Sequence, residues 1–288
     1  MPAKVAIICL CYNHEKYVEE AMDSALNQAY PIELIVVDDA STDNSVRIIR
    51  EFIKQHSNVN IRSLFFEKNV GNCKAFNSAL ELTNADYIID LAADDLLLPK
   101  RVEEGVENME LSPTVAVNFT NANYINEEGS FIKPHFPINS LGKAKVTVPQ
   151  GHLFHDILER YFICSPTMMY RASFLKEVGG YDETLAYEDF DIMLRLSRNY
   201  PFSYTDQLLV EKRILNVSMS TIQYNTGNGQ LNSTLEICKK AFGMIQGKRE
   251  KNALLKRVFY EAKQAFIHKR FILFSSFINL GYKIILQK

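Results

Sequence analysis

The first hundred residues alternate between short, almost continuous apolar runs and longer segments whose apolar positions recur with helical spacing. Continuous runs of this length are typical of parallel strands buried on both faces. The alternation predicts a parallel sheet with right-handed helical crossovers over residues 4–95. The predicted strands are 5–11, 32–37, 61–66 and 87–91, and the predicted helices are 15–28, 46–55 and 73–82.

Beyond Pro99 the pattern becomes less regular. Three prolines between residues 131 and 149 indicate an irregular, mobile loop that covers the expected ligand-binding site. The polar stretch 224–232 is interpreted as a linker, and helices are expected over 233–288. The other predicted helices are 100–109, 151–161, 171–178 and 187–197; β structure is predicted at 114–125, 165–170 and 202–214, with a hairpin turn at 126–129.

Adjacent carboxylates follow two of the predicted strands: Asp38 and Asp39 the second, Asp94 and Asp95 the fourth. Ligands of open α/β sheets bind at the carboxyl ends of the strands. Neighbouring carboxylates that lose water need a compensating cation, and a divalent metal that carries a diphosphate provides one. The alternative is a helix whose N-terminus Asp95 caps. A structural protein has no need of four carboxylates along one sheet edge, so the pattern favours a metal and phosphate site.

The composition, with 47% hydrophobic and 23% charged residues, is that of an ordinary soluble globular protein. The formal charge of -2 gives no reason to expect nucleic acid as a partner. Five cysteines without a C-x-x-C motif predict free thiols in a reducing compartment. We expect no signal peptide and no transmembrane helix, because no apolar run is long enough.

Five motifs occur in order along the chain: Tyr12-Asn13, and the segments 36–45, 69–77, 92–95 and 187–191. Over roughly residues 4–220 the chain resembles the family 2 inverting glycosyltransferases of the GT-A fold. The resemblance implies an α/β nucleotide-diphospho-sugar transferase fold, with a mainly parallel central sheet flanked by helices and a helical C-terminal extension. The implied catalytic domain is 1–222, with a nucleotide-sugar half at 1–99 and an acceptor half at 100–222, followed by a basic extension at 223–288.

The resemblance also implies a nucleotide-sugar donor, usually a UDP-sugar, a glycan or lipid-linked acceptor, and a divalent metal, Mn²⁺ or Mg²⁺. By motif position, Asp189 is the expected general base and Asp95 the expected metal ligand. Glu188 and Asp191 are expected to bind the acceptor or support the base. The expected nucleotide-sugar residues are Cys11, Asn13, Glu15, Asp39, Lys74, Asn77 and Asp94.

The chain departs from the family pattern at Leu10, Ala92 and Leu215, where many relatives have Pro, Asp and His. Because that His is a metal ligand in some relatives, phosphates, water and Asp95 are expected to supply most of the coordination here. The Q-x-x-R-W motif of processive members is absent, and the chain has no tryptophan. We therefore expect transfer of a single sugar.

Other interpretations of these residues remain open. Acidic residues are common in the first turn of a helix, and Asp191 has the spacing of an i,i+4 ion pair with Arg195. A nucleotidyltransferase of the same sheet type is an alternative, although it normally carries a glycine-rich loop where this chain has residues 12–15. A second alternative to a glycosyltransferase is a catalytically inactive protein that binds a nucleotide-sugar.

The C-terminal segment differs from the rest in charge. Residues 231–288 carry twelve Lys and Arg and three Glu, so +9, whereas the remainder carries 20 basic and 31 acidic residues, so -11. A basic amphipathic helix can lie in a membrane interface. We expect the intact protein to bind anionic liposomes through 233–288 in a salt-sensitive way, and to lose this binding on truncation near Asn232. We also expect a cytoplasmic protein that is peripheral to the inner face of a bacterial plasma membrane. Helices packed on the catalytic domain and a homodimer contact are the alternatives.

Overall fold

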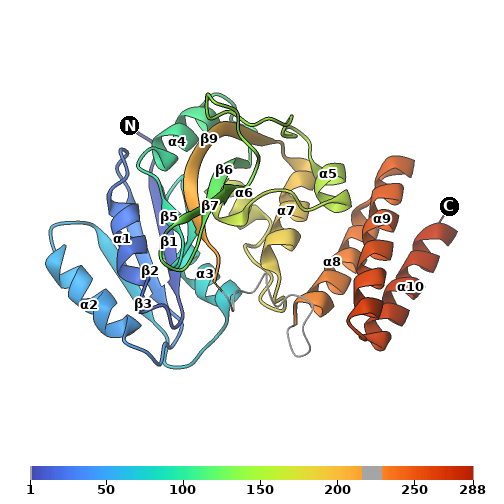
Figure 1. Ribbon diagram of the computed structural model, residues 1–288, viewed down its shortest axis with the longest axis horizontal. Coiled ribbons are helices and arrows are strands. Elements are labelled where there is room, and N and C mark those ends of the chain that lie inside the picture. Colours follow the sequence, from blue (N-terminus) through green and yellow to red (C-terminus); the bar gives the residue numbers. More distant parts are fainter. Residues whose placement is uncertain (1, 216–228, 288) are drawn as a thin grey trace. The chain divides into compact units, whose positions relative to one another are not determined.

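The computed structural model describes residues 2–215 and 229–287 and divides into two compact units (Figure 1). The predicted domain boundary at 222/223 and residues 224–228 of the predicted linker lie outside the described residues. The first unit comprises Met1–Gln150, Ile163–Tyr181 and Pro201–Leu215, and the second Gly151–Phe162, Asp182–Tyr200 and Asn216–Lys288.

The first unit is built on one nine-stranded sheet of described residues, with strand order β3-β2-β1-β4-β8-β6-β9-β5 and β7 paired to β6. The predicted parallel sheet is confirmed, because β1 pairs in parallel with β2 and β4, and β2 with β3. These strands are β1 (Val5–Cys11), β2 (Glu33–Asp38), β3 (Ile61–Phe65) and β4 (Tyr87–Ala92). The helices between them are α1 (Val18–Leu26), α2 (Ser45–Gln55) and α3 (Asn72–Glu81).

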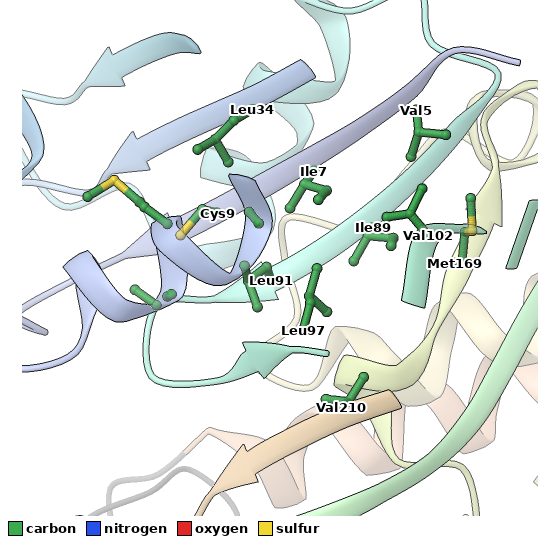
Figure 2. Packing of buried hydrophobic residues seen from close by; sticks show 14 of the residues in the cluster. Val5, Ile7, Cys9, Leu34, Ile89, Leu91, Leu97, Val102, Met169 and Val210 are labelled. Atoms are coloured by element: carbon green, nitrogen blue, oxygen red, sulfur yellow. The ribbon is translucent and has the colours of Figure 1, made fainter. Parts of the chain in front are cut away.

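The core explains the almost continuous apolar sequences of β1, β2 and β4. Val5, Ile7 and Cys9 of β1 point to one face of the sheet and join a buried cluster with Leu34 and Ile89 of the neighbouring strands (Figure 2). On the other face of β1, Ala6 and Ile8 are fully buried and Leu10 is half-buried. Burial on both faces fixes the register, since a slip of one residue would exchange the two apolar faces.

The remaining strands make the sheet mixed. β8 pairs antiparallel with β4 and β6, β9 pairs in parallel with β6, and β5 pairs antiparallel with β9. The predicted hairpin turn is confirmed between β6 and β7. The elements are β5 (Leu96–Leu97), α4 (Arg101–Glu110), β6 (Val117–Ile125), β7 (Phe131–Pro134), β8 (Met169–Arg171), α6 (Ala172–Glu177) and β9 (Phe202–Arg213).

The alternative in which Asp95 caps a helix is excluded, because Leu96 begins the short strand β5. Other sequence predictions were wrong in detail. The segment predicted as an irregular loop starts with β7, an edge strand that ends at Pro134, where a missing amide is tolerated. The strand predicted from residue 165 begins at Met169, because Ser165–Thr167 forms a 3₁₀ turn with Pro166 in it.

The second unit is helical in the part of the chain that is described. α9 packs against α5, α8 and α10, and α7 packs against α5 and α8. The predicted helical tail is confirmed, whereas the helix predicted at 151–161 is only α5. The bounds are α5 (Phe154–Glu159), α7 (Glu188–Asn199), α8 (Gln230–Met244), α9 (Gly247–Ile267) and α10 (Phe271–Leu286).

All five cysteines are free, as the sequence predicts, and all are buried. Among the described helices, none combines the length and the apolar character that a membrane crossing requires.

Candidate functional site

The loops after β1 and β2 are bonded to each other at the carboxyl edge of the sheet. The Asn13 amide N–H donates to Ser41 Oγ (2.9 Å), and Asn13 Oδ1 accepts the Thr42 N–H (2.7 Å). Glu15 Oε2 accepts the N–H of Asn44 (2.8 Å). Asn13 has a positive φ of 58°, which turns the chain sharply after the strand. Two of the predicted nucleotide-sugar residues thus lie together and fix both loops.

The first carboxylate pair shapes the same edge. Asp38 is fully buried, and its Oδ1 accepts the Ser41 N–H at 2.9 Å. Asp39 accepts two backbone amides, from Val70 (2.7 Å) and Gly71 (2.9 Å). Gly71 has φ 89°, a conformation strained for other residues. Asp39, one of the predicted nucleotide-sugar residues, therefore holds the turn that begins α3. Cys11, at the end of β1, is buried beside these loops.

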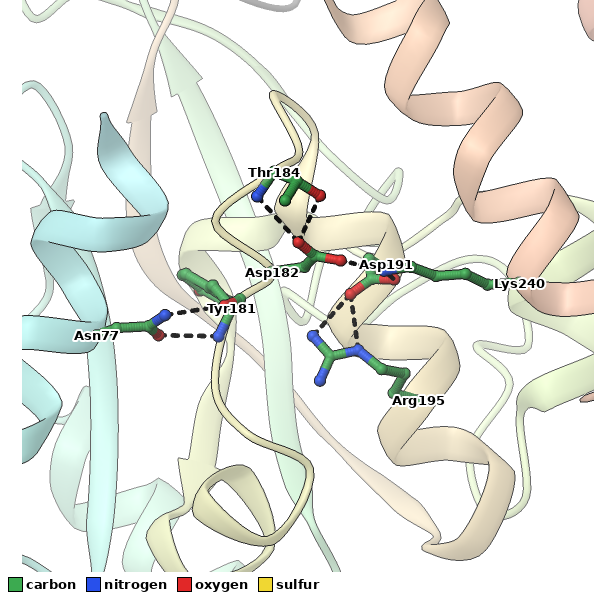
Figure 3. A network of polar contacts seen from close by, with 7 residues as sticks. All are labelled: Asn77, Tyr181, Asp182, Thr184, Asp191, Arg195 and Lys240. Carbon is green, nitrogen blue, oxygen red and sulfur yellow. Dashed lines mark hydrogen bonds and ion pairs between the residues drawn. The ribbon is translucent and has the colours of Figure 1, made fainter. Parts of the chain in front are cut away.

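α3 carries the predicted residues Lys74 and Asn77. The Asn77 side chain makes two hydrogen bonds with the Tyr181 backbone: Nδ2 donates to its carbonyl (2.8 Å), and Oδ1 accepts its N–H (2.9 Å) (Figure 3). A Cβ at Gly180 would lie 2.5 Å from Asn77 Oδ1, so the close approach requires glycine there. Asn77 is a structural link in this state, and Lys74 is exposed.

The second carboxylate pair lies in the turn between β4 and β5. Asp95 is only 4% exposed, and its Oδ1 accepts the backbone N–H of Arg213 at 2.8 Å. The Asp94 carboxylate lies 3.6 Å from His14 Nδ1. Burial, followed by the negative charge of Asp94, raises the pKa of Asp95 to about 8. The fold therefore places a carboxylate where ionisation costs free energy unless a cation is bound.

The side chain of Arg213, at the end of β9, is buried and holds this turn in place. Its Nε donates to the Asp94 carbonyl (3.0 Å), and Nη1 donates to the carbonyls of Asn126 (3.2 Å) and Glu127 (3.0 Å). Nη2 pairs with Glu20 of α1 at 2.8 Å. The sequence analysis noted only the missing histidine at Leu215 and did not predict this role for Arg213. β9 mixes polar and apolar residues, so the local sequence gives no signal of a buried arginine at its end.

The donor set fits a metal ion only in part. Among residues 2–215 and 229–287, no group of three or more His, Cys, Asp and Glu side chains could hold a metal. Asp94 and Asp95 remain, and Leu215 supplies no ligand. Mg²⁺ commonly binds through one or two carboxylates together with substrate phosphates and water. Because a cation would offset the cost of ionising buried Asp95, the pair fits a metal held jointly with a diphosphate.

In the second unit, three acidic residues lie in the first turn of α7: Glu188, Asp189 and Asp191. Asp191 is buried, and its Oδ2 lies 2.6 Å from Arg195 Nη2, which confirms the predicted i,i+4 ion pair. Its other oxygen, Oδ1, lies 2.8 Å from Lys240 Nζ of α8. Two cations therefore neutralise Asp191 (Figure 3).

Lys240 also binds Asp182, at the start of the segment that leads into α7 (Figure 3). Asp182 accepts the N–H (2.9 Å) and the hydroxyl (2.6 Å) of Thr184. Burial opposes ionisation of Asp182, but the hydrogen bonds from Lys240 and Thr184 outweigh it and hold its pKa below the usual range. One lysine of α8 thus fixes both ends of the segment 182–191, which contains Asp189.

Comparison with known proteins identifies the family of this chain. Residues 6–179 match the sequence model described as "Glycosyl transferase family 2". An uncharacterized glycosyltransferase of Methanocaldococcus jannaschii is 28% identical over 216 residues, 74% of this chain and 71% of the relative. Chondroitin synthase of Escherichia coli is 30% identical over 206 residues, 71% of this chain but only 28% of that much longer protein.

Two solved structures share the fold. Residues 1–349 of Staphylococcus aureus TarS, in complex with UDP-GlcNAc, align with a TM-score of 0.70 at 20% identity, over 91% of this chain and 72% of that one. The mannosyltransferase PcManGT of Pyrobaculum calidifontis, in complex with GDP-Man and Mn²⁺, aligns with a TM-score of 0.64 at 14% identity, over 100% of this chain and 88% of that one. These matches confirm the expected GT-A architecture.

The raised pKa of Asp95 predicts a pH-dependent stability. The native state favours the protonated carboxyl, so the stabilisation is present below the ordinary carboxyl pKa of 3.8 and is lost as the pH rises toward about 8. In metal-free buffer, Asp95→Asn should therefore gain thermal stability relative to the wild type as the pH rises from 4.5 to 8. Asp23→Asn, at an exposed site on α1, is the control and should show no such trend. A difference for Asp95→Asn that does not vary with pH would contradict the burial argument.

The two adjacent lysines of α8 provide a matched pair. Lys240→Ala should lower the free energy of unfolding by about 1–3 kcal/mol, because buried Asp191 loses one of its two cations. Lys239→Ala removes only an exposed pair with Glu236 and should cost less than about 0.5 kcal/mol. Chemical denaturation measures both. Equal losses would show that Lys240 has no special role in the fold.

Proposed function

The chain belongs to glycosyl transferase family 2, and from that premise we propose that it is an inverting enzyme that moves one sugar from a UDP-sugar to a glycan or lipid-linked acceptor. The observation that carries the proposal is the Asp94–Asp95 turn with its buried Asp95, held by Arg213 at the carboxyl edge of β4. This is the place where an α/β sheet binds its ligand, and its carboxylates need a cation.

We propose that the donor nucleotide binds over the loops that follow β1 and β2. Cys11, Asn13 and Glu15 would lie beside the nucleoside, and Asp39 beside its nucleobase. Lys74 and Asn77 would face the nucleotide or its sugar. Mutual bonding of these loops supports the proposal, since it orders the site before a ligand arrives. UDP-GlcNAc in TarS and GDP-Man in PcManGT are further support for a nucleotide-sugar donor.

Asp95 would hold Mn²⁺ or Mg²⁺ together with the diphosphate. The ion would offset the negative charge that develops on the leaving nucleotide. The backbone N–H of Arg213 orients the Asp95 carboxylate through Oδ1. The Asp94 carboxylate would bind the ribose or the donor sugar. Mn²⁺ in the PcManGT structure supports the choice of metal.

Asp189 is the proposed general base. It would take the proton of the acceptor hydroxyl as that oxygen attacks the anomeric carbon, and a single in-line displacement inverts the configuration. We assign the base to Asp189 because Arg195 and Lys240 neutralise the competing Asp191. Glu188 would orient the acceptor or support Asp189.

We also propose a role in polysaccharide biosynthesis of the cell envelope, by transfer of a hexosyl or N-acetylhexosaminyl group. Similarity to a bacterial chondroitin synthase supports this, although this chain spans 28% of that protein. We propose transfer of a single sugar, because the chain lacks tryptophan and the Q-x-x-R-W motif.

A donor screen tests the reaction and the metal together. The wild type with Mn²⁺ or Mg²⁺ should release UDP from one UDP-sugar when a glycan acceptor is present. Asp95→Ala should abolish this metal-dependent release while the circular dichroism spectrum is retained, and exposed Asp23→Ala is the control.

Other outcomes separate the alternatives. Wild-type turnover by Asp95→Ala would refute the metal assignment. Formation of pyrophosphate from UTP and a sugar 1-phosphate would identify a nucleotidyltransferase. Donor binding without any transfer, across a panel of acceptors, would favour an inactive binding protein.

The assignment of Asp189 as the general base predicts a loss of turnover without a loss of donor affinity. Asp189→Asn should lower kcat at least ~100-fold with little change in donor affinity. Glu188→Gln should mainly raise the KM for the acceptor. NMR of the wild-type product should show an inverted anomeric configuration, and a retained one would refute the mechanism. Loss of donor affinity with normal turnover in Asp189→Asn would make Asp189 a binding residue.

A further inference from the structure

The turn between α9 and α10 exposes an unusual set of side chains. We call residues 266–272, with the sequence Phe-Ile-His-Lys-Arg-Phe-Ile, the tip segment. Single exposed apolar residues are common on proteins, but a cluster of large ones marks an interaction site. Four of these seven residues are large, apolar and more than half exposed: Phe266 57%, Ile267 56%, Phe271 58% and Ile272 85%.

The exposed apolar surface continues along α9. Phe259 and Tyr260 are exposed too. Phe259 lies about two turns before Phe266, and Tyr260 about two turns before Ile267, so each pair shares a side of the helix. Lys256 and Lys263 are exposed among them. The opposite side of α9 is buried, and most of its apolar side chains are small: Ala253, Leu254, Val258, Ala262 and Ala265. The helix therefore has an inner face that packs and an outer face that mixes aromatic rings with lysines.

The tip segment is an ordered turn. The Phe266 ring packs 5.4 Å from that of Phe274 and 6.0 Å from that of Phe271. The Arg270 N–H donates to the Ala265 carbonyl at 2.7 Å, and Lys269 has a φ of 57°. These bonds close the α9 helix and start α10. The exposed rings are consequently held at a fixed place on the second unit.

The charges around this surface are positive. Lys263, Lys269 and Lys283 form no ion pair with any described residue. The three acidic residues of the C-terminal segment lie elsewhere: Glu236 pairs with Lys239 and Glu250 with Arg198, and Glu261 is buried. The outer face of α9 and the tip segment thus combine apolar groups with cations. Lys256 pairs with Glu159 of α5 at 2.8 Å, whereas Lys263 and Lys269 have no carboxylate partner among the described residues.

This combination favours one kind of partner. The buried centre of a protein–protein interface is depleted of lysine. The lysines among the apolar residues of this surface therefore argue against a second copy of the chain as its partner. Helices that lie in a membrane interface instead carry Lys and Arg beside aromatic and aliphatic residues. Anionic headgroups complement cations that have no carboxylate partner in the protein.

We propose that the tip segment and the outer face of α9 form a binding surface for an anionic lipid bilayer. Phe266, Ile267, Phe271 and Ile272 enter the headgroup boundary, and Lys263 and Lys269 lie among the phosphates. The surface belongs to the second unit alone and does not depend on the proposed transfer reaction, so binding is measured without donor or acceptor.

The test is co-sedimentation of the intact chain with vesicles of phosphatidylcholine alone or mixed with phosphatidylglycerol. Point substitutions are preferable to truncation, because α8 and α9 pack against α5 and α7 and their removal would expose apolar faces. Two variants target the surface: Ile272→Glu, and the double variant Lys263→Glu/Lys269→Glu. Two controls make the same changes at exposed sites of the first unit: Leu111→Glu, and Lys54→Glu/Lys68→Glu.

The wild type and both controls should bind the phosphatidylglycerol vesicles at low salt, and binding should fall as salt is added. Each surface variant should weaken binding at least about tenfold. Failure of the wild type to sediment with these vesicles, or equal binding to phosphatidylcholine alone, would overturn the proposal. So would a concentration-dependent dimer in analytical ultracentrifugation that the surface variants abolish, since the face would then be a self-interface.

Discussion

The site in the first unit depends on one buried cation. Arg213 is the last residue of β9, and through its guanidinium and backbone it bonds to α1, to the turn after β4 and to the β6–β7 turn. A planar guanidinium with five donors suits this task, because carbonyl oxygens and one carboxylate can all be satisfied in a fixed geometry. The same residue supplies the N–H that orients Asp95. The position of the buried Asp95 carboxylate is therefore set by a residue 118 positions away in the sequence.

The second unit shows a comparable dependence on distant parts of the chain. The family match ends at residue 179, yet the proposed base lies beyond it, in α7. Lys240 of α8 holds Asp182 and Asp191 on either side of Asp189. The C-terminal helices thus take part in fixing the segment that carries the base. Their basic, aromatic outer face gives the same helices a second role in the proposed contact with lipid.

Local pattern was sufficient to predict the parallel half of the sheet and the acidic strand ends. Strands β1, β2 and most of β4 are buried on both faces, so their apolar runs are nearly unbroken, and Asp38, Asp39, Asp94 and Asp95 fall where those runs stop. The partners of Arg213 were not predictable in this way, because Asp94 and Glu20 lie 119 and 193 residues from it in sequence. The motifs likewise gave no sign that Asp39 and Asn77 bond to backbone groups of distant turns.

The central claim is that Arg213 holds Asp94 and Asp95 ready for a metal and a diphosphate. Titration calorimetry of UDP into the wild type and Arg213→Lys, in Mn²⁺ or in EDTA, tests it most directly. Lysine keeps the charge but cannot make the four side-chain contacts. The account predicts that the wild type binds UDP tightly only with Mn²⁺, and that Arg213→Lys, still folded, weakens this binding at least about tenfold. Equal UDP affinity in Mn²⁺ and EDTA, or an unchanged affinity in Arg213→Lys, would contradict it.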